Sequence, residues 1–382
     1  MRRILIICAF MMVILLPSNT LPASNQNRML TSASENSLDD YFTHVVFCEF
    51  GSNTDSPLDP TVSEMLFNLY SSREYPFYYV SMVGNRENKA LERLENEYNI
   101  TSYPTLFFDG GYSVLYDTQI DEVSCINYIT TAGVRDAPDI TLTLSADWFQ
   151  DCCNKKVITN VNIRNNGDNQ YNGHIRVYLT EIKSRWYNNE GNPYHFGFLA
   201  YTIDREISVS PKNNLSITTG VDVTTIGYPD ATPDNLMIIG VLFNSEVHQG
   251  FSDSPHDTHP FDAYYVDAVD ADKVKGDLET WVKFNRPRTG FIYLFGLPIK
   301  RIFFDTPLLI GKTTVEAEVN RFLQTEKVEF YMDDKLRNTD TQPPYTWVWS
   351  DTLIGRHTIK AKAYHSGGIT SKTTQEVIAF IF

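Results

Sequence analysis

The chain has 382 residues, of which 42% are hydrophobic and 21% charged. It is long enough for several globular domains and too apolar for a disordered chain. The net charge is −15 at pH 7. Phosphate binding requires Lys and Arg side chains that displace counterions, and the sequence shows no basic stripe. This balance argues against nucleic acid and against anionic lipid as partners.

The N-terminus has the organisation of a secretory signal peptide. Arg2 and Arg3 precede an apolar run over residues 4–17, and small or polar residues follow as far as Ser24, with Ala23 at the expected cleavage edge. The run is shorter than the roughly 20 residues that span a bilayer. The alternative is an uncleaved N-terminal anchor. Both interpretations predict a cell-surface or extracellular protein, with residues 1–24 as signal and 25–39 as a polar leader.

Residues 40–137 alternate between strand and helix patterns. The clearest helix has apolar residues at i, i+3, i+4, i+7 and i+8, beginning at Val62. The expected order is a β-α-β unit followed by a β-hairpin and a final helix, which is the order of the thioredoxin fold. The predicted elements are strand 43–50, helix 56–73, strand 76–83, helix 88–98, strands 105–108 and 112–116, and helix 120–130.

Beyond Pro138 the pattern changes to short strands separated by Asn, Gly, Asp and Pro, which favours a β-sandwich over residues 138–270. Residues 271–288 read as a linker, and the polar stretch 270–284 suggests a short bridge, with a helix as one option. A second all-β module is expected over residues 289–382. The predicted strands of the two modules are 139–149, 156–163, 174–182, 196–203, 206–209, 215–223, 236–243, 263–269, 291–295, 314–319, 328–332, 345–349, 357–364 and 374–380.

Three runs of sequence carry a resemblance to known families. The segment Phe77–Gly111 (YYVSMV, LERLENEYNITSYPTLFFDGGY) resembles the thioredoxin-like domains of exported prokaryotic proteins, and those of archaea in particular. Gly173–Asp267 (VYLTEI, NLMIIGVLFNSEVHQGFSD) resembles the β-sandwich that follows such domains in some surface proteins. The run after residue 313 (TTVEAEV, KVEFYMDDKL, GRHTIKAKAY) is similar to Ig-like repeats of archaeal and bacterial surface proteins. The implied fold class is α/β plus all-β, a thioredoxin-like domain followed by two Ig-like β-sandwich domains.

The resemblance to thioredoxin-like domains implies a redox site at the start of the first helix. In this sequence the two cysteines of that site are absent. Active members carry Cys-x-x-Cys at the start of the first helix, where unpaired N–H groups stabilise a thiolate. The corresponding positions are Ser56 and Asp59 in Ser56-Pro57-Leu58-Asp59, and no Cys lies between residues 51 and 124. Thiol–disulfide exchange needs a second thiol to resolve the mixed disulfide. Tyr103-Pro104-Thr105 matches the family's cis-proline loop, which implies a cis peptide bond before Pro104.

The residues at the helix start also have a purely structural interpretation. Ser56 can cap the helix, Pro57 suits its first position, and Asp59 complements the helix dipole in a Ser-x-x-acid capping box. Such a cap contributes about 1 kcal/mol. The functional alternative uses Asp55 and Asp59 beside Pro104 as a ligand groove.

The remaining cysteines do not form a recognisable redox or metal motif. Cys48 sits inside an apolar strand and is expected to be a buried, inert thiol, although it is the thiol through which a single-cysteine oxidoreductase or isomerase would act. Cys125 is expected on the last helix. Cys152 and Cys153 are adjacent, with Cα atoms about 3.8 Å apart, so a bond between them would be strained. Pairing among these four cysteines stays open.

Two acidic clusters were considered as cation sites. Loops rich in His and Asp are more often solvated than metal-binding, and neither cluster has the spacing of a zinc or calcium motif. We therefore expect no metal and no cofactor. The clusters are His248, Asp253, His256, Asp257, His259 and Asp262 in one loop, and Asp267, Asp270 and Asp272 at the junction with the linker.

Two short motifs concern the surface. Asn99 and Asn214 begin N-x-Ser/Thr sequons, which could carry glycans in an exported protein. Asp333-Asp334-Lys335 is expected to form the turn of a hairpin after Met332.

The sequence as a whole predicts a non-catalytic binding or structural protein at the cell surface, with a redox-inactive thioredoxin-like domain and an unidentified protein or peptide ligand. Membrane contact is expected only through an uncleaved N-terminal segment. The alternative is an extracytoplasmic thiol–disulfide oxidoreductase or isomerase acting through Cys48. A metal-stabilised structural stalk is a third possibility.

Overall fold

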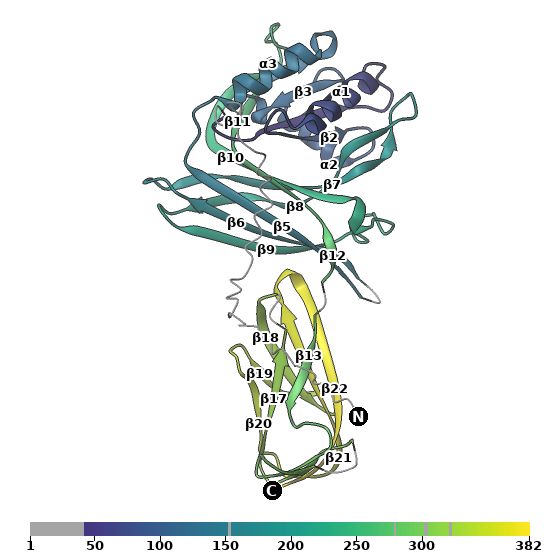
Figure 1. Ribbon diagram of the computed structural model, residues 1–382, viewed down its shortest axis with the longest axis vertical. Helices are drawn as coiled ribbons and strands as arrows, with labels where there is room; N and C mark the ends of the chain where they lie inside the picture. Colours follow the sequence, from purple (N-terminus) through teal and green to yellow (C-terminus); the bar gives the residue numbers. More distant parts are fainter. Residues whose placement is uncertain (1–41, 152–153, 279, 302–304, 321–322) are drawn as a thin grey trace, which may run out of the picture. The chain divides into compact units, whose positions relative to one another are not determined.

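A computed structural model describes residues 42–151, 154–278, 280–301, 305–320 and 323–382. The expected signal peptide and leader, Cys152 and Cys153 lie outside the described residues. Strands dominate, and the three α-helices that the structure describes fall between residues 59 and 133 (Figure 1). Across the described ranges, none of the helices combines the length and the apolar character needed to cross a bilayer.

The first part of the chain, called here the α/β unit (residues 42–137), contains four strands in the order β2-β1-β3-β4. β1 and β2 are parallel, while β3 is antiparallel to both β1 and β4. Figure 1 shows α1, α2 and α3 gathered around these strands. The elements are β1 (Val46–Ser52), α1 (Asp59–Ser72), β2 (Phe77–Val83), α2 (Asn88–Glu92) continuing into the π-helical turn η2 (Arg93–Glu97), β3 (Thr105–Phe108), η3 (Asp109–Gly111), β4 (Ser113–Tyr116), η4 (Asp117–Gln119) and α3 (Glu122–Gly133).

The strands of this unit are mostly apolar because both faces of the sheet are covered. β1 is buried at every position, and Leu66 and Leu69 of α1 and Ile129 of α3 belong to the same core. α3 begins at Glu122 because the side chain of Asp121 accepts a hydrogen bond from the backbone N–H of Ser124. The helices and strands of the α/β unit follow the order expected from the sequence.

The second part, called here the middle sandwich (residues 140–277), consists of strands in two sheets. One sheet has the order β12-β5-β6-β9, and the other contains β11-β10-β7-β8. Their facing side chains form a separate apolar core that includes Trp148, Ile175 and Ile238. The elements are β5 (Ile140–Gln150), β6 (Lys155–Asn165), β7 (Tyr171–Tyr187), β8 (Pro193–Val209), β9 (Asn214–Asp222), η5 (Pro233–Asn235), β10 (Leu236–Phe251), β11 (Pro260–Lys273) and β12 (Lys275–Asp277).

The α/β unit and the middle sandwich share one sheet of eight strands, in the order β11-β10-β7-β8-β2-β1-β3-β4. The link is a parallel pairing between Ser81 of β2 and Gly197 of β8. It is reinforced by Ser81, whose Oγ donates a hydrogen bond to the carbonyl of His195 at 2.7 Å. The sheet thus continues across the boundary that the change of sequence pattern suggested at residues 137 and 138.

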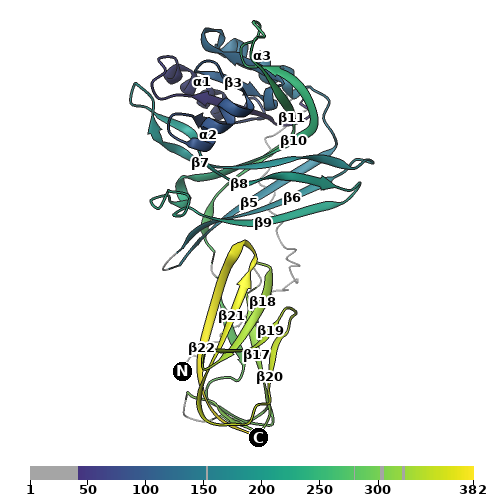
Figure 2. The same ribbon diagram turned by 180° about the vertical axis from the view of Figure 1, so that it is seen from behind.

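The two parts also share a hydrophobic core. Tyr178, Phe198 and Phe243 of the sandwich belong to the same buried cluster as Phe47 of β1. β11 lies against the turn at Gly110, where a Cβ atom would be 1.9 Å from the carbonyl oxygen of Tyr264. Figure 2 shows β10 and β11 extending beyond the sandwich beside α3. Glycine is required at this turn because of the close approach and because its φ is +68°.

The third part, called here the C-terminal module (residues 282–382), has a core of its own that includes Trp347 and Trp349, whose rings stack at 5.4 Å. One sheet has the order β13-β17-β20 and the other β15-β14-β16-β22-β21-β18-β19. The elements are β13 (Val282–Arg286), β14 (Phe291–Leu294), β15 (Leu297–Arg301), β16 (Leu308–Ile310), β17 (Thr313–Val319), β18 (Thr325–Met332), β19 (Lys335–Asp340), β20 (Tyr345–Trp349), β21 (Leu353–His365), η6 (Ser366–Gly368) and β22 (Ile369–Ile381).

The bridge between the two β parts contains short strands, not the helix that the sequence left as one option. β11 runs to Lys273, and residues 275–277 and 282–286 are strands. β12 pairs with β5 and β13 pairs with β17. These polar residues are extended because the edge of each neighbouring sheet supplies hydrogen-bond partners that sequence periodicity does not reveal. The sequence also missed β15, β16 and β19, which are short or polar strands. The hairpin turn at Asp333 and Asp334 is confirmed, with φ values of 47° and 62°.

Candidate functional site

The start of α1 is not capped as expected. The helix begins at Asp59, its N-cap is Leu58, and no side chain caps it. The hydroxyl of Ser56 instead donates to the carbonyl of Tyr103 at 3.2 Å. The capping-box prediction is therefore wrong, because the loop before α1 packs against the Tyr103–Pro104 loop and turns Ser56 away from the helix.

Asp59 is buried at this helix start. Its Oδ2 atom accepts hydrogen bonds from the backbone N–H of Asn53 at 2.8 Å and from the hydroxyl of Tyr194 at 3.0 Å. Its Oδ1 atom has no hydrogen-bond partner among the described residues. Burial raises the pKa of Asp59 to about 6, while hydrogen bonds to the carboxylate limit the rise.

The other residues of the expected groove do not join Asp59. The Tyr103–Pro104 peptide bond is cis, the geometry expected from the sequence. Asp55 is exposed and donates its backbone N–H to the side chain of Asn53 at 3.0 Å. Asp59, in contrast, has no exposed surface. The structure therefore does not bring Asp55 and Asp59 together in an open groove beside Pro104.

The two thiols that the structure describes lie in the hydrophobic core. Cys48 on β1 and Cys125 on α3 are both free and fully buried. Burial raises the pKa of Cys48 well above its usual value. Burial, with the nearby charges of Asp121 and Glu122, raises the pKa of Cys125 to about 12. A raised pKa disfavours the thiolate, which is the nucleophilic form of cysteine.

Three carboxylates of the acidic clusters accept hydrogen bonds from the protein itself. Asp253 accepts hydrogen bonds from the backbone N–H groups of Thr258 and His259 and lies 3.0 Å from the His259 Nδ1 atom. Asp270 accepts from the backbone N–H of Leu144 at 2.7 Å. Asp267 accepts from the hydroxyl of Tyr171 at 3.1 Å. Within the ranges that the structure describes, no three His, Cys, Asp or Glu side chains are placed to hold a metal ion.

The sequons lie at the surface. Asn99 and Asn214 are both exposed. The Asn99 amide donates to the carbonyl of Pro260 at 3.2 Å, and the Asn214 side chain accepts a hydrogen bond from Arg164 at 3.3 Å.

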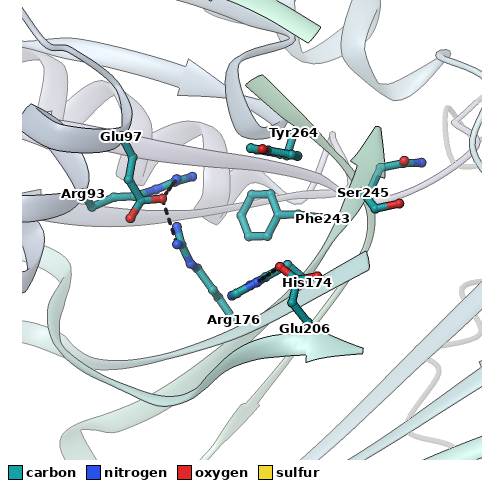
Figure 3. Close-up of a pocket in the computed structure, with 9 residues that line it drawn as sticks. Arg93, Glu97, His174, Arg176, Glu206, Phe243, Ser245 and Tyr264 are labelled. Atoms are coloured by element: carbon teal, nitrogen blue, oxygen red, sulfur yellow. Dashed lines mark hydrogen bonds and ion pairs between the residues drawn. The ribbon is translucent and has the colours of Figure 1, made fainter. Parts of the chain in front are cut away.

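A cleft of about 390 Å³ lies where the α/β unit meets the middle sandwich. Figure 3 shows the residues that converge on it: two guanidinium groups, two carboxylates, and the rings of Phe243, Tyr264 and His174. The ring of Phe243 is almost fully buried, and Tyr264 and Glu206 are exposed. The residues that line the cleft are Arg93, Glu97, His174, Arg176, Glu206, Phe243, Asn244, Ser245 and Tyr264.

A buried ion pair holds one wall of this cleft. Arg93 donates from Nε to Glu49 Oε1 at 3.0 Å and from Nη2 to Glu49 Oε2 at 2.8 Å. The hydroxyls of Tyr98 and Tyr178 also donate to Glu49. Burial alone would raise the pKa of Glu49, but the Arg93 guanidinium and these hydrogen bonds outweigh it and lower the pKa. Tyr178 belongs to β7, so the network ties the α/β unit to the sandwich.

A second network of ion pairs, more exposed than the first, forms the rest of this wall. Glu97 Oε2 accepts from Arg93 at 2.6 Å and from Arg176 of β7 at 2.8 Å. Arg176 also donates to Asp204 at 3.0 Å. His174 lies between Asp204, at 2.5 Å, and Glu206, at 3.0 Å. The hydrogen bond to Asp204 raises the pKa of His174 although partial burial opposes it.

Local irregularities in two elements shape the cleft. Arg93 and Glu97 lie on the π-helical turn η2, in which the N–H of Tyr98 donates to the carbonyl of Arg93. On β10, the pairing with β11 jumps from Phe243 to Val247, so that residues 244–246 bulge. Both features re-aim side chains and recur next to functional sites.

Sequence reasoning missed this cleft. Its residues are spread from position 93 to position 264, and no motif links them. The only local signal was Glu49, a charged residue within the apolar run VVFCEF, because a carboxylate in a buried strand requires a partner.

Residues 309–361 match the family model described as bacterial Ig domain. The chain carries a bacterial Ig-like domain. Among solved structures, fibronectin(III)-like modules of CbhA from Clostridium thermocellum are 25% identical, with coverage of 26% of this chain and 93% of that one and a TM-score of 0.20. A structural-genomics protein from Agrobacterium tumefaciens is 9% identical, with coverage of 62% and 96% and a TM-score of 0.36. A β-glucosidase from Listeria innocua is 14% identical, with coverage of 37% and 16% and a TM-score of 0.21. No curated protein matches the chain.

Proposed function

We propose that this chain is an exported binding protein of the cell surface or the extracellular space, with a thioredoxin-like α/β unit that has no redox activity. Its Ig-like domain supports the coarser part of this proposal, because bacterial Ig-like domains are typical of extracellular and surface proteins. The β-α-β unit followed by a β-hairpin and a helix, with a cis bond before Pro104, supports the thioredoxin-like part.

The observation that carries the proposal is the closure of the α1 start by Tyr194. In a redox enzyme of this fold, the thiols at the helix start must reach a disulfide of another protein. Here Ser56 and Asp59 occupy those positions, both are buried, and Tyr194 from β8 donates its hydroxyl to Asp59. The middle sandwich therefore fills the place where a disulfide substrate would dock.

The cleft between the two parts is the proposed ligand site. Phe243 and Tyr264 offer an apolar and aromatic surface, and Asn244 and Ser245 of the β-bulge offer hydrogen-bonding groups. The charged residues that line the cleft include two arginines and two glutamates. Arg93 is buried and Arg176 half-buried, whereas Glu97 and Glu206 are both exposed. A peptide segment with a basic side chain matches these two exposed carboxylates, which lie in a part of the chain, residues 1–281, with 37 acidic and 18 basic residues.

Disulfide reduction by the purified protein tests the redox half of the proposal. We expect no turnover of a model disulfide, and Cys48→Ala should behave as the unsubstituted protein does. Turnover that disappears in Cys48→Ala would establish the oxidoreductase alternative. A known thiol–disulfide enzyme serves as the positive control.

Fluorescence polarisation with labelled basic, neutral and acidic peptides of equal length tests the binding half. We expect the basic set to bind, with affinity that falls as salt rises. Tyr264→Ala and Glu206→Gln should each weaken binding by about tenfold, whereas Tyr187→Ala, an exposed tyrosine on β7 outside the cleft, should not. Equal binding by all three variants would refute this site.

A further inference from the structure

The outer face of the seven-stranded sheet in the C-terminal module carries a continuous apolar surface. Residues paired across neighbouring strands place their side chains on the same face of a sheet. One row, called here the apolar row, crosses five strands and contains only large hydrophobic residues. It consists of Leu297 on β15, Leu294 on β14, Ile310 on β16, Phe380 on β22 and Ile354 on β21.

This row faces solvent. Leu297 and Ile354, at its two ends, are 63% and 71% exposed, and Leu294 and Phe380 are each about 40% exposed. The residues between them in sequence, such as Leu309 and Ala379, point the other way into the core. Single exposed leucines are common, but a contiguous apolar row on a soluble module marks an interaction surface.

The next row along the same face has a cation at each end. Lys300 on β15 and Arg356 on β21 flank Ile292, Leu308 and Ile378. Both cations are exposed, and neither forms an ion pair with another residue in the ranges that the structure describes. These two rows are thus apolar with a basic residue at each end of the second row.

The charge of the module differs from that of the rest of the chain. Residues 282–382 carry 14 Lys and Arg against 10 Asp and Glu, although the chain as a whole has a net charge of −15. The argument from total charge against anionic lipid therefore does not apply to this module, because electrostatic attraction is screened beyond about 10 Å and depends on the local charges.

Several features of the edge strand of this sheet disfavour pairing with a strand of another molecule. β15 is the edge strand, and all five of its residues are exposed. It contains Pro298, which cannot donate to a neighbouring strand, the basic pair Lys300 and Arg301, and a register shift at Ile299. These are devices by which proteins prevent edge-to-edge association. A second copy of the chain is therefore a poor occupant of this edge, whereas lipid requires no backbone hydrogen bonds.

The tip of the β14–β15 hairpin presents a further aromatic ring. Phe295 has a φ of +48°, which is unusual for a bulky residue, and its side chain is 61% exposed. Strained backbone at an exposed hydrophobic residue is a feature of functional surfaces.

From these observations we infer that the outer face of the C-terminal module binds an anionic lipid surface. The apolar row and Phe295 enter the interface between headgroups and acyl chains, and Lys300, Arg301 and Arg356 contact lipid phosphates. This attachment is independent of the ligand cleft and would hold the exported protein at a membrane.

Vesicle co-sedimentation of the full chain tests the inference, with vesicles of phosphatidylcholine alone and of phosphatidylcholine mixed equally with phosphatidylglycerol. We expect binding to the mixed vesicles and little to the neutral ones. Leu297→Ser combined with Ile354→Ser should weaken binding by about tenfold, since these side chains leave water on binding. Lys300→Glu combined with Arg356→Glu should weaken it by tenfold or more at low salt.

A matched variant controls for nonspecific adsorption. Val348→Ser removes an exposed hydrophobic residue of the same module that lies on β20, in the other sheet, and it should bind as the unsubstituted chain does. Circular dichroism melting should show all variants folded, because the substituted side chains are exposed.

Two results would overturn the inference. One is equal sedimentation of the unsubstituted chain, the apolar variant and the control, which would place any lipid contact elsewhere, for example in the N-terminal apolar run. The other is a concentration-dependent dimer, seen by analytical ultracentrifugation, that is lost only in the Leu297→Ser/Ile354→Ser variant. That result would identify the face as a contact between copies.

Discussion

The hydroxyl of Tyr194 lies 3.0 Å from the Oδ2 atom of Asp59, although 135 positions separate the two residues in sequence. Tyr194 comes from β8 of the middle sandwich, and Asp59 is the first residue of α1. The pair is buried, so a tyrosine of the sandwich covers the start of α1. This contact ties the start of α1 to the middle sandwich.

Asp59→Asn should change the pH dependence of stability. Burial raises the pKa of Asp59 from 3.8 to about 6 in the folded state. A raised carboxyl pKa destabilises the fold as pH rises through the window between these two values. The variant cannot ionise, so its stability relative to the unsubstituted protein should improve by about 2–3 kcal/mol between pH 4 and pH 7.5. Urea unfolding at the two pH values measures the difference. Asp55→Asn, at an exposed position, should show no such trend.

Tyr194→Phe should destabilise the protein by about 1–3 kcal/mol at pH 7.5, because a buried carboxylate then loses a hydrogen-bond donor. The loss should shrink at pH 4, where Asp59 is protonated. Denaturant unfolding of this variant beside Tyr187→Phe, whose side chain is exposed, checks the prediction. A loss independent of pH would show that Tyr194 acts through packing alone.

Glu49→Gln should be strongly destabilising. Glu49 is the buried carboxylate that receives two hydrogen bonds from Arg93. Without it the guanidinium keeps only Glu97 as an anionic partner, and breaking a buried ion pair on one side costs about 3–5 kcal/mol. Chemical denaturation measures this cost. Glu206→Gln, at an exposed carboxylate of the same cleft, should change stability by less than about 0.5 kcal/mol.

His174 should contribute stability that depends on pH in the opposite sense to Asp59. The hydrogen bond to Asp204 raises its folded-state pKa above 6.5. The contribution is therefore complete below pH 6.5 and is lost as pH rises through the raised pKa. His174→Gln should be less stable than the unsubstituted protein at pH 5.5 and should match it at high pH. The effect should be small because His174 is partly exposed. An NMR titration of the ring that shows an unshifted pKa would contradict this assignment.

Cys48 and Cys125 should be unreactive in the folded protein. Both are buried and their pKa values are raised. A thiol reagent at pH 8 should modify them only after denaturant is added, because the thiolate is the reactive form. Mass spectrometry after alkylation identifies the modified positions. Rapid labelling of Cys48 in native conditions would contradict this prediction and favour the alternative of an enzyme that acts through Cys48.

The sequence by itself determined the order of the elements in the α/β unit, the two following β parts and the hairpin at Asp333. These features depend on local patterns: the helical spacing from Val62, alternating runs, and Asp residues that tolerate a left-handed turn. The sequence likewise shows that the positions of Ser56 and Asp59 carry no thiol, because this depends only on which residues occupy them.

Only the tertiary structure decided what those positions do. Ser56 does not cap α1 because it bonds to the Tyr103 carbonyl, and Asp59 is buried by a tyrosine from a distant strand. The cleft and the apolar row arise in the same way, from residues brought together by pairing between strands. Such contacts depend on the register and packing of elements far apart in the chain, and periodicity along one segment carries no information about its neighbours in space.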